Sequence, residues 1–211
     1  MVDVDAFFDD FPVLETERLV LRQIRPSDTT AIYALFSDEA VTRHYGLETF
    51  TAVEQAAQRI AAMRQNYQKR RSIRWAITTQ GDDALIGSVG LMNLRPKFFN
   101  AAVGYELAPA YWRRGVMTEA LTAVIEFSFV IMALNRIEAF VVPENTPSIH
   151  LLEKLGFVHE GLMREYGYWR QAFHDLHLFA LLRKEWPGAA TPDTLRGAVT
   201  LRGVGTQRGD R

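Results

Sequence analysis

Hydrophobic and polar residues alternate in several short stretches of the chain, as expected for β-strands with one buried face. Leu19 and Leu21 alternate with basic neighbours, and the same period of two recurs at Ile73, Trp75 and Ile77. Five more stretches predict the remaining strands: 85–94, 102–108, 136–142, 158–168 and 172–182. The last two are rich in aromatic residues.

Other stretches repeat hydrophobic residues every three or four positions, which predicts helices. Ser27 is expected to cap the first helix, and a capping box of Thr51 and Glu54 the second. A third helix follows Gly115, and a fourth begins after Asn145 and ends at Gly156. The expected fold class is α+β, with a mostly antiparallel sheet, helices on both faces and one central strand–helix–strand unit.

The length of 211 residues suits one domain with short extensions. The expected domain spans 14–186, preceded by an N-terminal extension over 1–13. Beyond Trp186 the composition shifts to Gly, Thr, Pro and Arg, so 187–211 is expected to be a flexible tail.

Composition excludes several function classes. A net charge of −1 gives no electrostatic reason to expect nucleic acid or an anionic membrane as partner, and the absence of cysteine excludes disulfides and thiolate chemistry. No signal peptide or membrane span is expected, which predicts a cytoplasmic protein. His174 and His177 would lie on opposite faces of a strand, so no metal site is expected.

The segment 111–118 is the first candidate for chemistry, because it leads from a strand into a buried helix. A helix start offers free N–H groups and the positive end of the helix dipole, which suits a pyrophosphate. Gly115 would let phosphate approach the backbone, and Arg113 and Arg114 would add charge. An ordinary solvated helix start is the alternative.

Around this segment the chain resembles the GCN5-related N-acetyltransferases (GNAT), specifically the branch that acetylates the N-termini of ribosomal proteins. Four segments carry the resemblance in order: 16–22, 104–121, 145–164, and the aromatic terminal strands that end at Arg183 and Trp186. The resemblance implies acetyl-CoA as cosubstrate and a primary amine as acceptor. No metal is expected, and the chain is expected to be a monomer or a homodimer.

The resemblance also implies where acetyl-CoA lies. Its pantetheine arm would occupy a gap between the strands 104–108 and 136–142, and its pyrophosphate would rest on the N–H groups of 114–117. The implied cofactor-binding residues are Leu107, Ala108, Arg113, Arg114, Gly115, Val116, Met117, Thr118, Asn145 and Ser148. The chain departs from the family at Arg113, where a small residue is usual, at Met117, where Gly or Ala is common, and at Leu151-Leu152, where many members carry a general-acid Tyr.

Two residues are candidates for proton transfer. Glu106 is the candidate base for the attacking ammonium, with a solvent-facing surface carboxylate as the alternative. Ser148 is the candidate acid for the leaving thiolate, matching a serine of the ribosomal-protein branch; helix capping is the alternative.

The predicted reaction is a direct attack of the amine on acetyl-CoA, with no covalent enzyme intermediate. A protein or peptide N-terminal amine is the favoured acceptor. An aminoglycoside, a polyamine or an amino acid remains open as acceptor, and a non-catalytic acyl-CoA-binding module is the alternative from another class.

Overall fold

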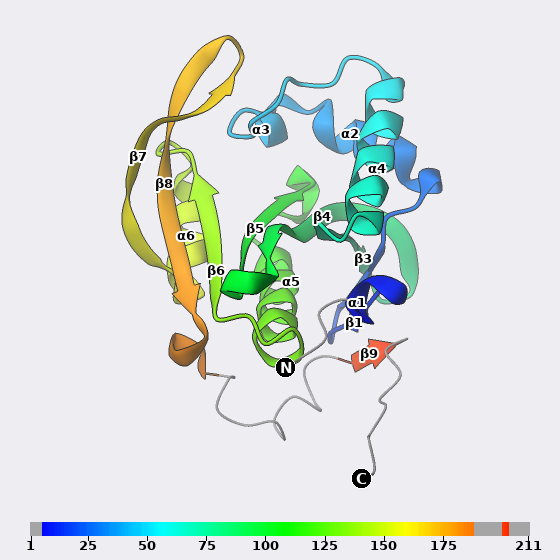
Figure 1. The fold of residues 1–211 in the computed structure, drawn as a ribbon. Coiled ribbons are helices and arrows are strands. Elements are labelled where there is room, and N and C mark those ends of the chain that lie inside the picture. Colours follow the sequence, from blue (N-terminus) through cyan, green and yellow to red (C-terminus); the bar gives the residue numbers. More distant parts are fainter. Residues whose placement is uncertain (1–5, 188–199, 203–211) are drawn as a thin grey trace.

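The computed structural model describes residues 6–187 and 200–202. One mixed sheet forms the centre (Figure 1), with strands in the order β7-β8-β6-β5-β4-β3-β2-β1-β9. The strands are β1 Val13–Glu15, β2 Leu19–Gln23, β3 Ile73–Thr79, β4 Asp82–Arg95, β5 Asn100–Leu107, β6 Arg136–Val141, β7 Val158–Trp169, β8 Ala172–Leu182 and β9 Thr200–Arg202. Every strand pair is antiparallel except β5–β6, which is parallel. The predicted α+β class is confirmed.

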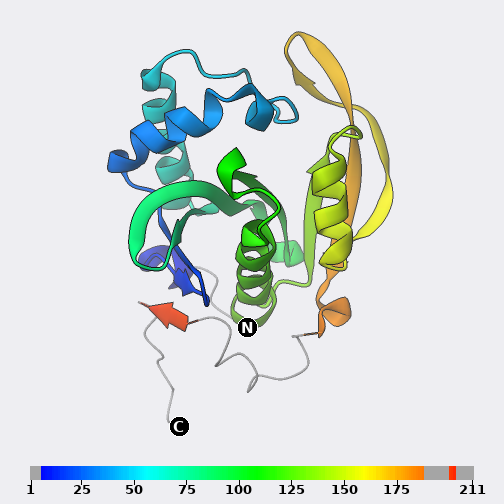
Figure 2. The same ribbon diagram turned by 180° about the vertical axis from the view of Figure 1, so that it is seen from behind.

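Helices cover both faces of this sheet. They are α1 Ala6–Asp9, α2 Thr29–Phe36, α3 Glu39–Thr42, α4 Val53–Gln68, α5 Val116–Glu126 and α6 Thr146–Lys154, and α5 continues as a π-helical turn over Phe127–Ile131. Figure 2 shows α5 and α6 together on one face, while α4 lies on the other face with α2 packed against it. The central β5–α5–β6 unit is the predicted strand–helix–strand unit.

The sheet separates two hydrophobic cores. The side chains of Trp75 and Ala76 point to opposite faces because they are neighbours in β3. Trp75 packs in the core under α5, where its ring lies 5.6 Å from that of Phe127, and Ala76 packs in the core under α2 and α4 with Phe36. Successive side chains of β3 therefore contribute in turn to the cores on the two faces of the sheet.

Described segments near both ends of the chain pack against the rest of the fold. Phe7 of the expected N-terminal extension is buried against Phe127, and the Trp75 indole donates a hydrogen bond of 2.6 Å to the carbonyl of Pro12. In the expected tail, β9 pairs with β1 at the edge of the sheet. Residues 188–199 and 203–211 of that tail lie outside the described part of the chain.

Two predicted helix caps are wrong by one residue. Ser27 lies inside a 3-10 turn, Pro26–Asp28, and Asp28 is the cap position of α2. At α4 the side chain of Gln55, rather than Glu54, accepts from the N–H groups of Thr51 and Ala52. The chain enters each helix one residue later than the sequence pattern predicts, because a turn or extended residue precedes the first helical position.

The other helix signals are confirmed. Asn145 caps α6 by accepting from the N–H of Ser148, and Gly156 ends that helix with a φ of 86°, in the left-handed region. No helix in residues 6–187 is both long enough and apolar enough to span a bilayer.

Candidate active site

The parallel strands β5 and β6 separate soon after they meet. Only Asn100, Ala101 and Ala102 of β5 pair with β6, although β5 continues to Leu107. The odd-numbered residues of β5 direct their backbone groups toward β6, as the hydrogen bond from Arg136 N–H to Phe99 C=O shows. The backbone of Tyr105 and Leu107 thus faces the place where the strands have parted.

The end of β5 supplies fewer free backbone groups than the resemblance implies. The Ala108 N–H donates to Ile86, and the Ala108 carbonyl accepts from Tyr111, each at 2.9 Å. The Leu107 carbonyl accepts from the Trp112 indole at 2.7 Å. Tyr105, which the sequence analysis did not include among the cofactor-binding residues, presents its backbone to the gap.

Helix α5 begins at this same end of β5. Gly115 is its cap residue, with a φ of 75°, and Arg113 also has a positive φ, of 59°. Glycine adopts a positive φ most easily, so Arg113 holds a backbone angle that costs a residue with a Cβ some strain. The side chains of Arg113 and Arg114 are exposed, so the loop presents two cations beside the free N–H groups of the helix start.

A salt bridge that the sequence analysis missed holds this loop in place. The Arg18 guanidinium donates to the Arg114 carbonyl at 3.1 Å and to the Glu119 carboxylate at 2.6 Å. Burial of Glu119 opposes ionisation, but hydrogen bonds from Thr16 and Arg18 outweigh it and lower the pKa of its carboxyl. Arg18 and Glu119 both lie in segments that carry the family resemblance. That resemblance was the sequence signal that could have identified this salt bridge.

Ser148, in the first turn of α6, meets Tyr105 across the face that carries α5 and α6. The Tyr105 phenol oxygen lies 2.6 Å from the Ser148 hydroxyl oxygen. Burial raises the pKa of Tyr105 to about 12. The Ser148 hydroxyl bonds Tyr105, and the Asn145 side chain caps α6 instead.

Glu106 points to the opposite face, since it is the next residue along β5. It is buried, so the alternative of a solvent-facing carboxylate is wrong. Its Oε2 accepts from Arg74 and from the Tyr45 phenol, and its Oε1 accepts from Ser88. Burial opposes the charge on Arg74, but Glu106 beside it raises the pKa of the guanidinium.

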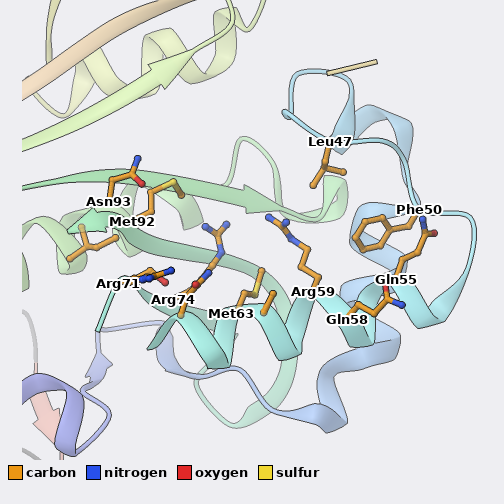
Figure 3. A pocket seen from close by; sticks show the side chains of 14 residues that line it. Leu47, Phe50, Gln55, Gln58, Arg59, Met63, Arg71, Arg74, Met92 and Asn93 are labelled. Atoms are coloured by element: carbon orange, nitrogen blue, oxygen red, sulfur yellow. The ribbon is translucent and has the colours of Figure 1, made fainter. Parts of the chain in front are cut away.

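A cleft of about 620 Å³ opens on the same face, between α4 and the strands β3 and β4. Figure 3 shows Arg59 from α4 and Arg74 from β3 reaching into the same space. Both guanidinium groups donate to the Tyr45 phenol, at 3.3 and 3.2 Å. Arg74 thereby connects the cleft to Glu106.

The structure thus sorts the candidate residues into three groups. The loop 113–118 lies at the start of α5, Ser148 and Asn145 lie at the start of α6, and Glu106 lies on the far side of β5. Two of these groups have partners whose contacts no sequence pattern indicated. Glu106 is bonded by Arg74 and Tyr45, and Ser148 is bonded by Tyr105.

Comparison with known proteins agrees with this geometry. The family description "Acetyltransferase (GNAT) domain" matches residues 18–158. The N-acetyltransferase YoaA of Bacillus subtilis is 40% identical over 173 residues, which is 82% of this chain and 98% of that protein.

Two further proteins are similar over most of the chain. The [ribosomal protein uS5]-alanine N-acetyltransferase of Escherichia coli is 27% identical, with 83% of this chain and 93% of that protein covered. Among solved structures, Mycobacterium smegmatis RimJ in complex with CoA-disulfide is 26% identical, with a TM-score of 0.72 and coverage of 90% and 95%.

Proposed function

The chain belongs to the GNAT family and is an acetyl-CoA-dependent N-acetyltransferase, and on this premise we propose that it acetylates the N-terminal α-amine of a peptide or protein. The observation that supports acetyl transfer at this site is the separation of β5 from β6 after Ala102. It leaves a stretch of β5 with a hydroxyl pair on one face and a buried carboxylate on the other.

The residues at the gap fit acetyl-CoA, which supplies the activated acetyl thioester. The N–H groups at the start of α5 suit its pyrophosphate, and Arg113 and Arg114 add positive charge there. The backbone of Tyr105 and the N–H of Leu107 face no partner strand, so they can bond an extended pantetheine as an added strand would. The Leu107 carbonyl is already taken by the Trp112 indole.

Proton handling divides between the two faces of β5. An ammonium must lose a proton before it can attack, and Glu106 is the proposed base, acting directly or through a water. Its Oε1 has one protein partner, Ser88, and so retains a second lone-pair position. On the other face, the Ser148 hydroxyl is proposed to donate to the departing thiolate.

Two considerations favour an α-amine over a lysine side chain. The [ribosomal protein uS5]-alanine N-acetyltransferase of E. coli, by its name, acts on a protein alanine. An α-amine also has a pKa about 2.5 units below that of lysine, so deprotonation costs roughly 3.4 kcal/mol less.

Thiol release in the presence of acetyl-CoA tests the proposal. The panel holds a peptide with a free N-terminus and no lysine, the same peptide with a blocked N-terminus and one lysine, and spermidine. We expect release with the first peptide alone. Turnover of the lysine peptide or spermidine, with the free N-terminus inert, would overturn the proposed acceptor.

A further inference from the structure

The cleft between α4, β3 and β4 carries an excess of positive charge that the transfer reaction does not use. Three arginines line it, Arg59, Arg71 and Arg74, and none of the described lining residues is acidic. The other polar lining residues are neutral: Gln55, Gln58, Asn66, Ser72 and Asn93.

Only one of the three arginines is neutralised by an ion pair. Arg74 is paired with Glu106. Within the described part of the chain, neither Arg59 nor Arg71 has a carboxylate partner. Arg59 Nε is moreover buried without a hydrogen-bond partner. Desolvating a cationic group that lacks an anion is unfavourable, so this arrangement favours an anionic ligand.

Packing fixes the Arg59 guanidinium in this position. Its central carbon lies 4.7 Å from the centre of the Phe36 ring and 5.5 Å from that of Tyr45. A guanidinium stacked in this way loses little further freedom when it binds a planar anion, and its fork of N–H groups matches the two oxygens of a carboxylate.

The cleft adjoins the face of β5 where the acceptor amine would lose its proton. Arg74 lines the cleft and contacts Glu106, and its Nη1 lies 3.7 Å from the point where a Cβ on Gly104 would stand. A ligand that entered the cleft would therefore lie alongside the proposed base.

We propose that this cleft binds a carboxylate carried by the acceptor, so that the preferred substrate is a peptide with an acidic side chain close behind its N-terminal amine. The inference rests on the proposed function for the identity of the acceptor. A polycationic amine, such as a polyamine or an aminoglycoside, is disfavoured because its further ammonium groups would meet Arg59 and Arg71.

Peptide binding to the CoA-loaded enzyme tests the inference without requiring turnover. Three peptides start with alanine and differ only at positions two and three, which are both Glu, both Gln or both Lys. We expect the Glu peptide to bind about 10-fold more tightly than the Gln peptide, a typical effect of charge-assisted hydrogen bonds, and the Lys peptide to bind most weakly.

Variants locate the effect in the cleft. Arg59→Gln and the more exposed Arg71→Gln should each reduce Glu-peptide binding by about 10-fold and leave Gln-peptide binding nearly unchanged. Arg64→Gln is the matched control, because Arg64 lies in α4 but does not line the cleft. Far-ultraviolet circular dichroism checks that each variant is folded. If Arg59→Gln does not fold, the result for Arg71→Gln decides the test.

The outcomes are distinguishable. Equal binding of the Glu and Gln peptides, or a Glu preference that survives both cleft substitutions, overturns the inference. Thiol release with the same peptides reports separately on the proposed function. A Glu preference lost in the variants, without any acetylation of an N-terminus, would support the carboxylate site and reject the proposed acceptor.

Discussion

At the scale of single residues, the two neighbours Tyr105 and Glu106 have opposite surroundings because they point to opposite faces of β5. Tyr105 meets one hydroxyl, that of Ser148, in an otherwise apolar setting. Glu106 lies in a buried polar cluster with Arg74, Tyr45 and Ser88. In the proposed mechanism, one strand thus separates the group that takes the amine proton from the group that protonates the thiolate.

Glu106→Gln is expected to slow turnover by roughly 100- to 10,000-fold at neutral pH, the usual value of general-base catalysis. The defect should shrink at high pH, where free amine is abundant. Stability should also fall, by about 3–5 kcal/mol, because the substitution leaves Arg74 buried without its anion. Steady-state rates across pH and urea unfolding measure the two effects.

The double variant Glu106→Gln/Arg74→Met separates catalysis from folding. Removing both partners should recover much of the lost unfolding free energy without restoring the rate. A single Glu106→Gln enzyme that turns over at the wild-type rate at neutral pH would show that another group takes the proton.

Tyr105→Phe is expected to lower kcat by about 10-fold, because the Ser148 hydroxyl loses the partner that orients it. Ser148→Ala should lower kcat further, by roughly 100-fold. KM for acetyl-CoA should change little in Tyr105→Phe, because the phenol is not among the implied cofactor-binding groups. Tyr33→Phe, in α2 on the opposite face, is the control; equal rates for Tyr105→Phe and wild type would remove Tyr105 from the site.

The raised pKa of Tyr105 determines how this residue affects the rate and the stability of the protein at different pH values. A pKa of about 12 keeps the phenol protonated up to the ordinary tyrosine value of 10.0, so Tyr105 causes no change of rate below that pH. Its stabilising contribution is complete below pH 10.0 and is lost as the pH rises through about 12, where the folded state must also give up the proton. Phenolate absorbance, compared between wild type and Tyr105→Phe, measures this titration.

At the scale of elements, the loop between β5 and α5 contains two residues with positive φ, and only one of them is glycine. A Cβ at Gly115 would stand 3.5 Å from Arg18 Nη2, which is an ordinary contact, so its backbone angle rather than space restricts substitution. Arg113 already accepts such an angle on the exposed side of the loop.

Gly115→Val is therefore expected to bind acetyl-CoA at least 10-fold more weakly, because a branched residue at this φ costs about 1–2 kcal/mol or displaces the helix start. Arg113→Gly should bind within about threefold of wild type, since relief of backbone strain offsets the loss of an exposed, screened charge. Titration calorimetry with acetyl-CoA measures both. Equal losses in the two variants would contradict a backbone-based phosphate site.

At the scale of the whole molecule, the tail and the candidate site lie at different parts of the sheet. β9 pairs with β1 at one edge, and four strands separate it from β5. A chain that ends at Gly188 lacks β9. We expect its kcat/KM to stay within about twofold of the full chain, with a small loss of unfolding free energy from the unpaired edge.

Turnover and urea unfolding of the truncated chain check this expectation, and light scattering reports its oligomeric state. An inactive but folded truncation would contradict the prediction and place the tail in the working enzyme. A change of subunit number would give it a role between chains.

Local patterns in the sequence predicted most of the strands and helices and both ends of α6. Alternation in β3 and the helical period in α4 depend only on which faces are buried, so they can be read along the chain. Asn145 and Gly156 bound α6 because each meets a backbone requirement that few residues satisfy. The caps at Ser27 and Glu54 were misplaced by one residue because the chain enters each helix one residue later than the local pattern predicts.

The contacts that define the candidate site were decided by tertiary structure. Tyr105 and Ser148 are 43 positions apart, and Arg74 and Glu106 are 32 apart. Their meeting depends on the register of β3, β4 and β5 and on the placement of α6 over the sheet. The sequence made Glu106 a candidate for proton transfer, and the family resemblance did the same for Ser148; both roles stay predictions. Only the packing of distant elements gave Glu106 its arginine and Ser148 its tyrosine, and set Arg59 and Arg71 in one cleft. Tertiary structure decided these contacts because no local pattern encodes which surfaces will face each other.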